Sequence, residues 1–285
     1  MKKLLTTLSI ITAFTSIISS NIGVFYKTGG ARRVVENIYG KQVTLYGDGI
    51  YANDSLLKVS TTKGTDIVII AAAIILLAVL LIYSNRKASI FLQAGLLLII
   101  LYATTCLIMG MGFNRLFLLY VLQFSSSLFA FILSLHQILT TETYKEKIYE
   151  KNFKGTGIFI IISGCSVLIW LAFILPAVIT GQPLETIEIY TTEPTFAIDL
   201  AIVLPSTVFC GISLLRKKKI GYKLAPVLLT FLTGVGLCVI FQTVHQTSLG
   251  IILPIGKLFV LVGSFIILGI IAVVLNIKFL TTQNE

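Results

Sequence analysis

A few polar and ionisable side chains of this sequence stand inside long apolar runs or at their ends. An ionisable group among apolar residues is costly to bury, so it usually faces a protein interior and has a partner. The side chains that we predict to form one polar cluster are Asp66, Arg115, Asp199, Gln242, His245 and Lys257. Such a cluster can form ion pairs, bind a small ligand or transfer protons.

Asp199 and Lys257 are predicted to lie at a similar depth in two different helices. If an apolar helix begins near Gly250, a rise of about 1.5 Å per residue places Lys257 roughly 10 Å along its axis. Asp199 follows the start of its own apolar run by about three residues, so one interpretation is an interior ion pair. In the other, the lysine stem reaches back to the lipid headgroups and has no protein partner.

Two apolar runs carry polar side chains on one helical face. The first face consists of Asp199, Ser206, Cys210 and Ser213, and the second of Thr230, Gly234, Cys238, Gln242 and His245. The spacing in each set matches one side of a helix. Small and hydroxylated residues also let membrane helices approach closely, so both faces are typical of helix packing as well as of a ligand site.

Two members of the predicted cluster, Asp66 and His245, have simpler alternatives. Asp66 can be a charge at a helix N-terminus, where the macrodipole favours it. His245 lies near the end of a run and can be a solvated end residue rather than a proton acceptor. Arg115 stands in a short connection at the same rim.

The elements that position these side chains are predicted to be membrane-spanning helices. The chain has 285 residues, of which 56% are hydrophobic and 12% charged, with a mean hydropathy of +0.97. Runs of about 18 or more apolar residues recur, and their backbone groups must be paired internally in lipid. We predict one all-α membrane domain over residues 1–285, with eight spans at 4–23, 66–84, 88–110, 114–135, 156–178, 197–215, 223–244 and 250–276.

The distribution of basic residues predicts the orientation of the bundle. If the N-terminus is cytoplasmic, 14 of the 22 Lys and Arg residues fall on the cytoplasmic side, as short inner segments favour. Both termini are then cytoplasmic, in a plasma membrane. The net charge of +10 indicates contact with anionic membrane lipids and not with nucleic acid.

The first apolar run has two interpretations. Lys2 and Lys3 followed by apolar residues ending at Ser19 and Ser20 resemble a secretory signal peptide with a cleavage site. The apolar stretch continues to Tyr26, however, which is long enough to cross and favours a retained anchor.

The loop at 27–65 is the one sizeable water-exposed segment that the sequence predicts. Residues 42–46 and 50–51 flank Gly47-Asp48-Gly49, which is typical of a β-hairpin turning at Asp-Gly. Asp48, Asn53 and Asp54 do not have the spacing of a calcium loop, so no metal site is predicted. A hairpin cap on the extracytoplasmic side is expected.

Two parts of the chain resemble a group of uncharacterised bacterial multi-spanning membrane proteins. The first part comprises residues 43–51, 53–55 and 63–66; the second comprises Asp199, Pro205, the basic residues 216–219, Gly221 and Tyr222. The resemblance implies a bacterial plasma-membrane protein of unknown activity. It brings no catalytic residues.

Catalytic motifs are not found in the sequence: no His-Glu-x-x-His helix, Gly-x-Ser-x-Gly turn or phosphate-binding loop occurs. The four cysteines form no Cys-x-x-Cys pair and are expected to be packing residues. We therefore expect no cofactor and no enzyme activity.

The favoured function is binding of a small ligand, a lipid or a membrane-protein partner at the extracytoplasmic side. The alternative is a secondary transporter that uses Asp199, Lys257 and His245, with proton coupling as one form of it.

Overall fold

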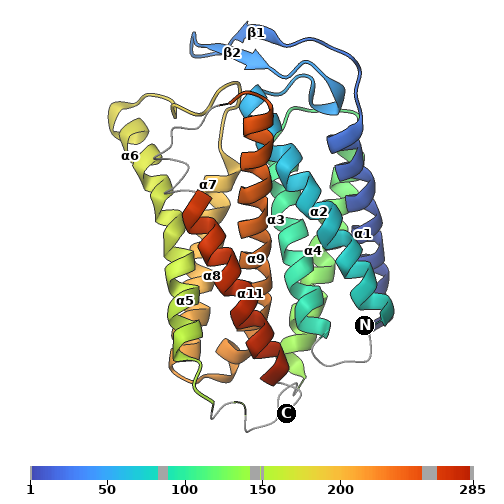
Figure 1. Cartoon of the computed structure of the whole chain (residues 1–285), viewed down its shortest axis with the longest axis vertical. Coiled ribbons are helices and arrows are strands. Elements are labelled where there is room, and N and C mark those ends of the chain that lie inside the picture. Colours follow the sequence, from blue (N-terminus) through green and yellow to red (C-terminus); the bar gives the residue numbers. More distant parts are fainter. Residues whose placement is uncertain (1, 83–88, 142–147, 149–150, 252–261, 283–285) are drawn as a thin grey trace.

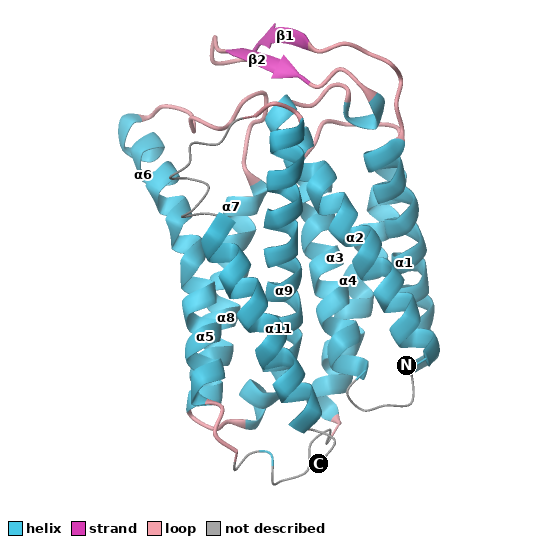
Figure 2. Ribbon diagram, viewed as in Figure 1, coloured by secondary structure: helices cyan, strands magenta, loops and turns pink. Residues whose placement is uncertain are grey.

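A computed structural model of the chain describes residues 2–82, 89–141, 148, 151–251 and 262–282. These residues are mostly helical (Figure 2). They include eight stretches long and apolar enough to cross a membrane. The unbroken ones are α1 (Lys2–Phe25), α2 (Leu56–Ile82), α3 (Ser89–Gly110), α4 (Phe117–Thr140), α9 (Lys219–Ser248) and α11 (Ser264–Thr282). The predicted all-α bundle with eight spans is confirmed.

Two stretches change helix type partway along. One joins α5 (Lys154–Cys165), a 3₁₀ segment (Ser166–Trp170) and α6 (Leu171–Thr180), and the other joins α7 (Pro194–Ile198), a π-helical segment (Asp199–Val203) and α8 (Leu204–Leu215). Because Pro205 has no N–H, it cannot donate to the carbonyl of Ala201, and the wider π turn lies directly before it. Single π turns of this kind are frequent at functional sites.

The helices form one bundle around α9. This helix contacts α2, α3, α8 and α11, while α1 packs on α2 and α4, and α5 packs on α8. The start of α1 and the end of α11 lie at one end of the bundle, and the two strands lie at the other (Figure 1). We refer to these as the terminal end and the hairpin end.

A two-stranded hairpin stands between α1 and α2, as predicted, but its turn is not where the sequence indicated. β1 (Arg33–Glu36) pairs antiparallel with β2 (Gln42–Leu45), with Val34 opposite Thr44. Residues 50–51, predicted to belong to the second strand, are part of a 3₁₀ turn (Gly49–Tyr51) instead. The predicted turn at 47–49 was therefore wrong.

Side-chain hydrogen bonds explain this difference. Asn37 Oδ1 accepts the backbone N–H of Tyr39 at 3.0 Å, and Gly40 has a φ of 75°, so the turn forms between β1 and β2. Asp48 is engaged elsewhere: its carboxylate accepts the N–H of Thr28 at 2.6 Å. This hydrogen bond lowers the pKa of the Asp48 carboxyl.

α2 begins at Leu56, well before residue 66, where the second span was predicted to start. Ser55 lies at its N-cap, and Ser55 Oγ accepts the backbone N–H of Lys58 at 3.2 Å. The first turns of α2 carry polar residues such as Lys58, so a prediction based on apolar runs did not include them. The eighth span was predicted at 250–276; within the described residues α11 covers Ser264–Thr282, and residues 252–261 lie outside them.

α1 turns a row of hydroxyl side chains towards α3 and α4. Thr12 donates to Ser126 Oγ at 3.0 Å. Ser19 donates to Gln123 Oε1 at 2.6 Å, and Gln123 Nε2 donates to Thr104 Oγ1 at 2.7 Å. We name the full set the polar ladder: Ser9, Thr12, Ser19, Gln93, Thr104, Gln123 and Ser126.

Candidate functional site

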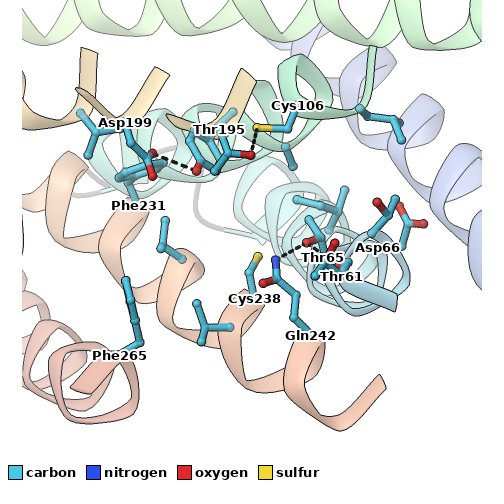
Figure 3. A pocket seen from close by; sticks show the side chains of 18 of the residues that line it. Thr61, Thr65, Asp66, Cys106, Thr195, Asp199, Phe231, Cys238, Gln242 and Phe265 are labelled. Atoms are coloured by element: carbon cyan, nitrogen blue, oxygen red, sulfur yellow. Dashed lines mark hydrogen bonds between the residues drawn. The ribbon is translucent and has the colours of Figure 1, made fainter. Parts of the chain in front are cut away.

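A cavity of about 290 Å³ lies in the hairpin half of the bundle. Figure 3 shows side chains that line it. Its lining extends from Lys58 and Gln246, near the hairpin ends of α2 and α9, down to Ile69 and Phe231, near the midpoints of the same helices. The 3₁₀ and π-helical segments of the two broken stretches also contribute to the wall. The cavity therefore occupies one half of the bundle, beside its irregular helices.

Asp199 is the most distinctive group in this wall. It is the first residue of the π-helical segment and is only 7% exposed. Tyr102 donates its hydroxyl to Oδ1 at 2.9 Å, and Trp170 donates its indole N–H to Oδ2 at 2.8 Å. Among the described residues, no basic side chain forms an ion pair with this carboxylate.

Aromatic packing fixes both donors. The Trp170 ring stacks on Phe196, with centroids 4.6 Å apart, and the Tyr102 ring meets Phe231 edge-on at 5.4 Å. The carboxylate of Asp199 is thus held by two neutral donors on rigid rings.

Asp66 lies on the far side of the cavity from Asp199 in Figure 3. It belongs to the third turn of α2 and is 5% exposed, so the alternative of a charge at the helix N-terminus was wrong. Tyr51, from the 3₁₀ turn after the hairpin, donates to Asp66 Oδ2 at 2.9 Å. A Cβ on Gly23 would lie 2.3 Å from the same oxygen, so only glycine permits this approach of α1. One hydrogen bond therefore connects the hairpin loop to the cavity wall.

The other predicted site residues are distributed unevenly. Gln242 lines the cavity and donates to Thr65 Oγ1 at 2.8 Å, where α2 and α9 meet. His245 is half-buried in the last turn of α9 and is not part of the wall. Arg115 is exposed in the turn between α3 and α4, also away from the cavity. Lys257 lies outside the described residues, so its pairing with Asp199 stays a prediction.

The predicted polar face of the sixth span is altered by the π turn. Asp199, Cys210 and Ser213 are buried as expected, but Ser206 is only half-buried, whereas Thr207 is fully buried. A π turn takes more residues than an α turn, so it shifts the helical phase after Val203. A spacing argument that assumes a regular α-helix cannot include this shift.

Three residues of the site were not predicted from the sequence. Tyr102 and Trp170 hold Asp199, and Ser163 lines the cavity with a buried hydroxyl that has no hydrogen-bond partner in the described part of the chain. The signal available for Trp170 was its position: it is the one tryptophan of the chain and lies inside an apolar run, away from an interfacial belt. Tyr102 and Ser163 had no comparable signal.

A group of polar side chains closes the hairpin end beside the cavity. We name it the clasp: Asp54, Ser55 and Lys58 on one side, and Glu188, Tyr190 and Glu193 on the other. Lys58 Nζ lies 2.9 Å from Glu193 Oε1. Tyr190 donates to Asp54 Oδ1 at 3.0 Å, and Ser55 donates its hydroxyl to Glu188. Burial raises the pKa of the Asp54 and Glu188 carboxyls.

All four cysteines are free thiols. Cys106 and Cys238 line the cavity, and Thr195 donates its hydroxyl to Cys106 Sγ at 3.8 Å (Figure 3). Cys210 is buried in the apolar core of the terminal half. Within the described ranges, no group of three metal-ligating side chains occurs.

The arrangement suits recognition of a small molecule. It combines a buried carboxylate, a hydroxyl without a partner and aromatic rings around a preformed space. Comparison with protein-family models, with curated proteins and with solved structures found no match.

Proposed function

We propose that this polytopic membrane protein binds a small ligand in the hairpin-half cavity, from the extracytoplasmic side, and acts as a sensor or accessory protein rather than as an enzyme. The distribution of basic residues supports the orientation, with both termini cytoplasmic. The resemblance in residues 43–66 and 199–222 supports a bacterial plasma membrane.

The observation that carries the proposal is the environment of Asp199. A carboxylate taken out of water at membrane depth is costly, and a chain retains such a group where it has a use. Its described partners, Tyr102 and Trp170, are neutral donors, and it borders an open space rather than packed side chains. A ligand in that space supplies the missing interaction.

The depth of the cavity favours binding over passage. Its lining ends at residues near the midpoints of α2 and α9, and below that level the terminal half is packed with apolar side chains around Phe91, Tyr222 and Phe279. A ligand that enters from the hairpin end therefore meets a closed floor.

Transport is the second candidate, and one observation favours it. Both broken stretches contribute their 3₁₀ and π-helical segments to the cavity wall. Secondary transporters often bind substrate at discontinuous helices near the midplane. If the floor opens during a transport cycle, the same cavity serves as the outward-facing site.

Thiol labelling tests whether the cavity is reached from outside. In intact cells, versions that retain one native cysteine each are treated with a membrane-impermeant thiol reagent at alkaline pH. We expect labelling at Cys106, which lines the cavity, and none at the matched control Cys210, which is buried in the terminal half. An unlabelled Cys106 in a folded protein would count against the proposal.

The same reagent tests the orientation in a version without native cysteines. Asp48→Cys, in the hairpin loop, should be labelled without permeation, whereas Lys218→Cys, at the start of α9, should need it. Labelling of Lys218→Cys from outside would reverse the proposed orientation.

A transport assay separates the two candidates. The protein is reconstituted in vesicles that are loaded with the ligand, and exchange of the ligand across the bilayer is measured. A binding protein should show saturable binding without exchange, and a transporter should show both.

A further inference from the structure

The surroundings of Asp199 have the composition of a cation site. Two aromatic residues, Tyr102 and Trp170, direct their hydrogens at the carboxylate, and Phe231 and Phe265 add two more rings to the cavity wall. A carboxylate oxygen has about two acceptor sites, so each oxygen of Asp199 can take a further hydrogen bond. Aromatic faces attract cations through their quadrupole.

We infer that the ligand carries a small organic ammonium group, bound by Asp199 and by the aromatic rings of this wall. The inference rests on the proposed function and names the ligand class of the same cavity. The ammonium supplies the charge that compensates Asp199, and its carbon substituents contact the rings. Together these two interactions satisfy a buried charge that the described residues leave without a cationic partner.

Other ligand classes suit this wall less well. An anion would face two buried carboxylates, Asp199 and Asp66, across a small cavity. A metal ion needs several oxygen, nitrogen or sulfur ligands around one point, and in the described parts of the chain no three metal-ligating side chains gather. A neutral apolar molecule would leave the Asp199 charge without compensation.

Ser163 provides an independent second observation. Its side chain is 4% exposed, it lines the cavity, and its hydroxyl oxygen has no hydrogen-bond partner in the described part of the chain. A buried hydroxyl without a partner costs free energy, so it indicates a polar group that occupies the space. An ammonium N–H or a hydroxyl on the ligand can pair with it.

The volume limits the size of the ligand. About 290 Å³ lies at the lower end of small-molecule pockets, which suits an amine with a few carbon atoms. Lys58, a residue of the clasp, lines the hairpin end of the cavity and is paired with Glu193. The space for a cation therefore lies between Lys58 and the floor of the cavity, which again favours a compact ligand.

Trp170 is a built-in reporter for the test, because it is the single tryptophan and hydrogen-bonds to Asp199. Purified protein in nanodiscs of uncharged lipid is titrated with ethanolammonium, with choline and with 3,3-dimethylbutan-1-ol, the neutral isostere of choline, while the tryptophan emission is recorded. We expect at least one ammonium compound to bind about tenfold more tightly than the neutral alcohol.

Variants assign this preference to the site. Asp199→Asn keeps the shape and can still pair with Tyr102 and Trp170, and it should abolish the preference. Tyr102→Phe, which removes one hydrogen bond only, should reduce it without loss of folding. The matched control Glu185→Gln removes one negative charge from an exposed loop residue outside the cavity and should leave the preference unchanged.

Each remaining outcome contradicts a defined statement. Equal binding of the alcohol and the ammonium ions overturns the inference and leaves the proposed function intact. No emission change with any probe, in protein whose Cys106 is labelled from outside, also overturns the inference alone. If no probe changes the emission and Cys106 is also not labelled from outside, the proposed function is contradicted as well. Ammonium binding that appears only in Lys257→Met overturns the inference, because Asp199 then has an internal partner.

Discussion

The polar ladder between α1, α3 and α4 and the cavity wall around Asp199 use similar residue types in opposite ways. In the ladder, side-chain hydrogen bonds join neighbouring helices, as that from Ser19 to Gln123 does at 2.6 Å, and all three helices are regular. In the wall, Ser163 has no described partner, and a carboxylate is held by neutral donors beside an open space. The helices there change type.

This difference separates polar residues that hold a membrane bundle together from those that serve a ligand. Matched hydrogen bonds between regular helices stabilise packing and need nothing else. Incomplete pairing next to a cavity and a helix break indicates that a partner is missing. The number of polar residues in a span does not distinguish the two cases, and an unpaired hydroxyl alone does not either, since the buried hydroxyl of Ser16 in α1 has no described partner and Ser16 lines no part of this cavity. Incomplete pairing together with an adjacent cavity distinguishes them.

Asp199→Asn tests the wall, where the largest effect is expected. Binding of an ammonium ligand should fall at least tenfold, because the compensating charge is gone. Thermal stability should be kept or should rise by about 1 kcal/mol, since the substitution removes a buried charge. Ligand titration and thermal unfolding of the same preparation check both parts. A variant that unfolds more easily and still binds would place Asp199 in the packing class.

Gln123→Leu tests the ladder, and the opposite result is expected. The change removes the acceptor of Ser19 and the donor to Thr104, so the free energy of unfolding should fall by about 1–2 kcal/mol. Both hydroxyls retain backbone acceptors, at Ser16 and Ile100, which limits the loss.

Binding should change less than twofold in Gln123→Leu, although Gln123 also borders the cavity. Gln182→Leu, at an exposed loop residue, is the matched control and should leave both stability and binding unaltered. A tenfold loss of binding in Gln123→Leu would remove the distinction between ladder and wall.

The pH dependence of stability tests the comparison further. The clasp beside the cavity contains the carboxyls of Asp54 and Glu188, whereas the polar ladder contains no carboxyl group. Burial raises the pKa of Asp54 and Glu188 above their ordinary values of 3.8 and 4.5. The folded state therefore binds protons more readily than the unfolded state. Stability from these groups is fully present below the ordinary values and is lost as the pH rises through the raised ones.

Thermal unfolding measured between neutral pH and about pH 4 should show this gain on acidification, worth less than about 1 kcal/mol because solvent screens both groups in part. Glu188→Gln together with Asp54→Asn should flatten the profile, and Gln123→Leu should not. If the dependence of thermal stability on pH is unchanged in the clasp variant, the gain on acidification does not come from Asp54 and Glu188.

The sequence was sufficient for the framework of the fold. Apolar run length predicted the eight spans, because lipid allows few other solutions for a backbone that must pair internally. It failed where side-chain hydrogen bonds decide local structure: Asn37 set the hairpin turn, and Ser55 started α2 early. At the candidate site, Asp66, Asp199 and Gln242 do line the cavity, but the partners of the two aspartates, Tyr51, Tyr102 and Trp170, come from other elements of the fold. Spacing along one helix carries no information about such partners.

The smallest expected effect concerns Asp199 and Lys257, the pair that the sequence suggested. If Asp199 is kept for a ligand, the changes Asp199→Asn and Lys257→Met should add, with a coupling free energy below about 0.5 kcal/mol. If the two side chains are paired, Lys257→Met should leave an uncompensated buried charge and cost several kcal/mol, and the double variant should be less damaged than that single variant. Thermal unfolding of the wild type, both single variants and the double variant, without ligand, measures the coupling. A coupling well above the limit would show that Asp199 is a paired structural residue, as the residues of the polar ladder are, because its partner would then be part of the bundle.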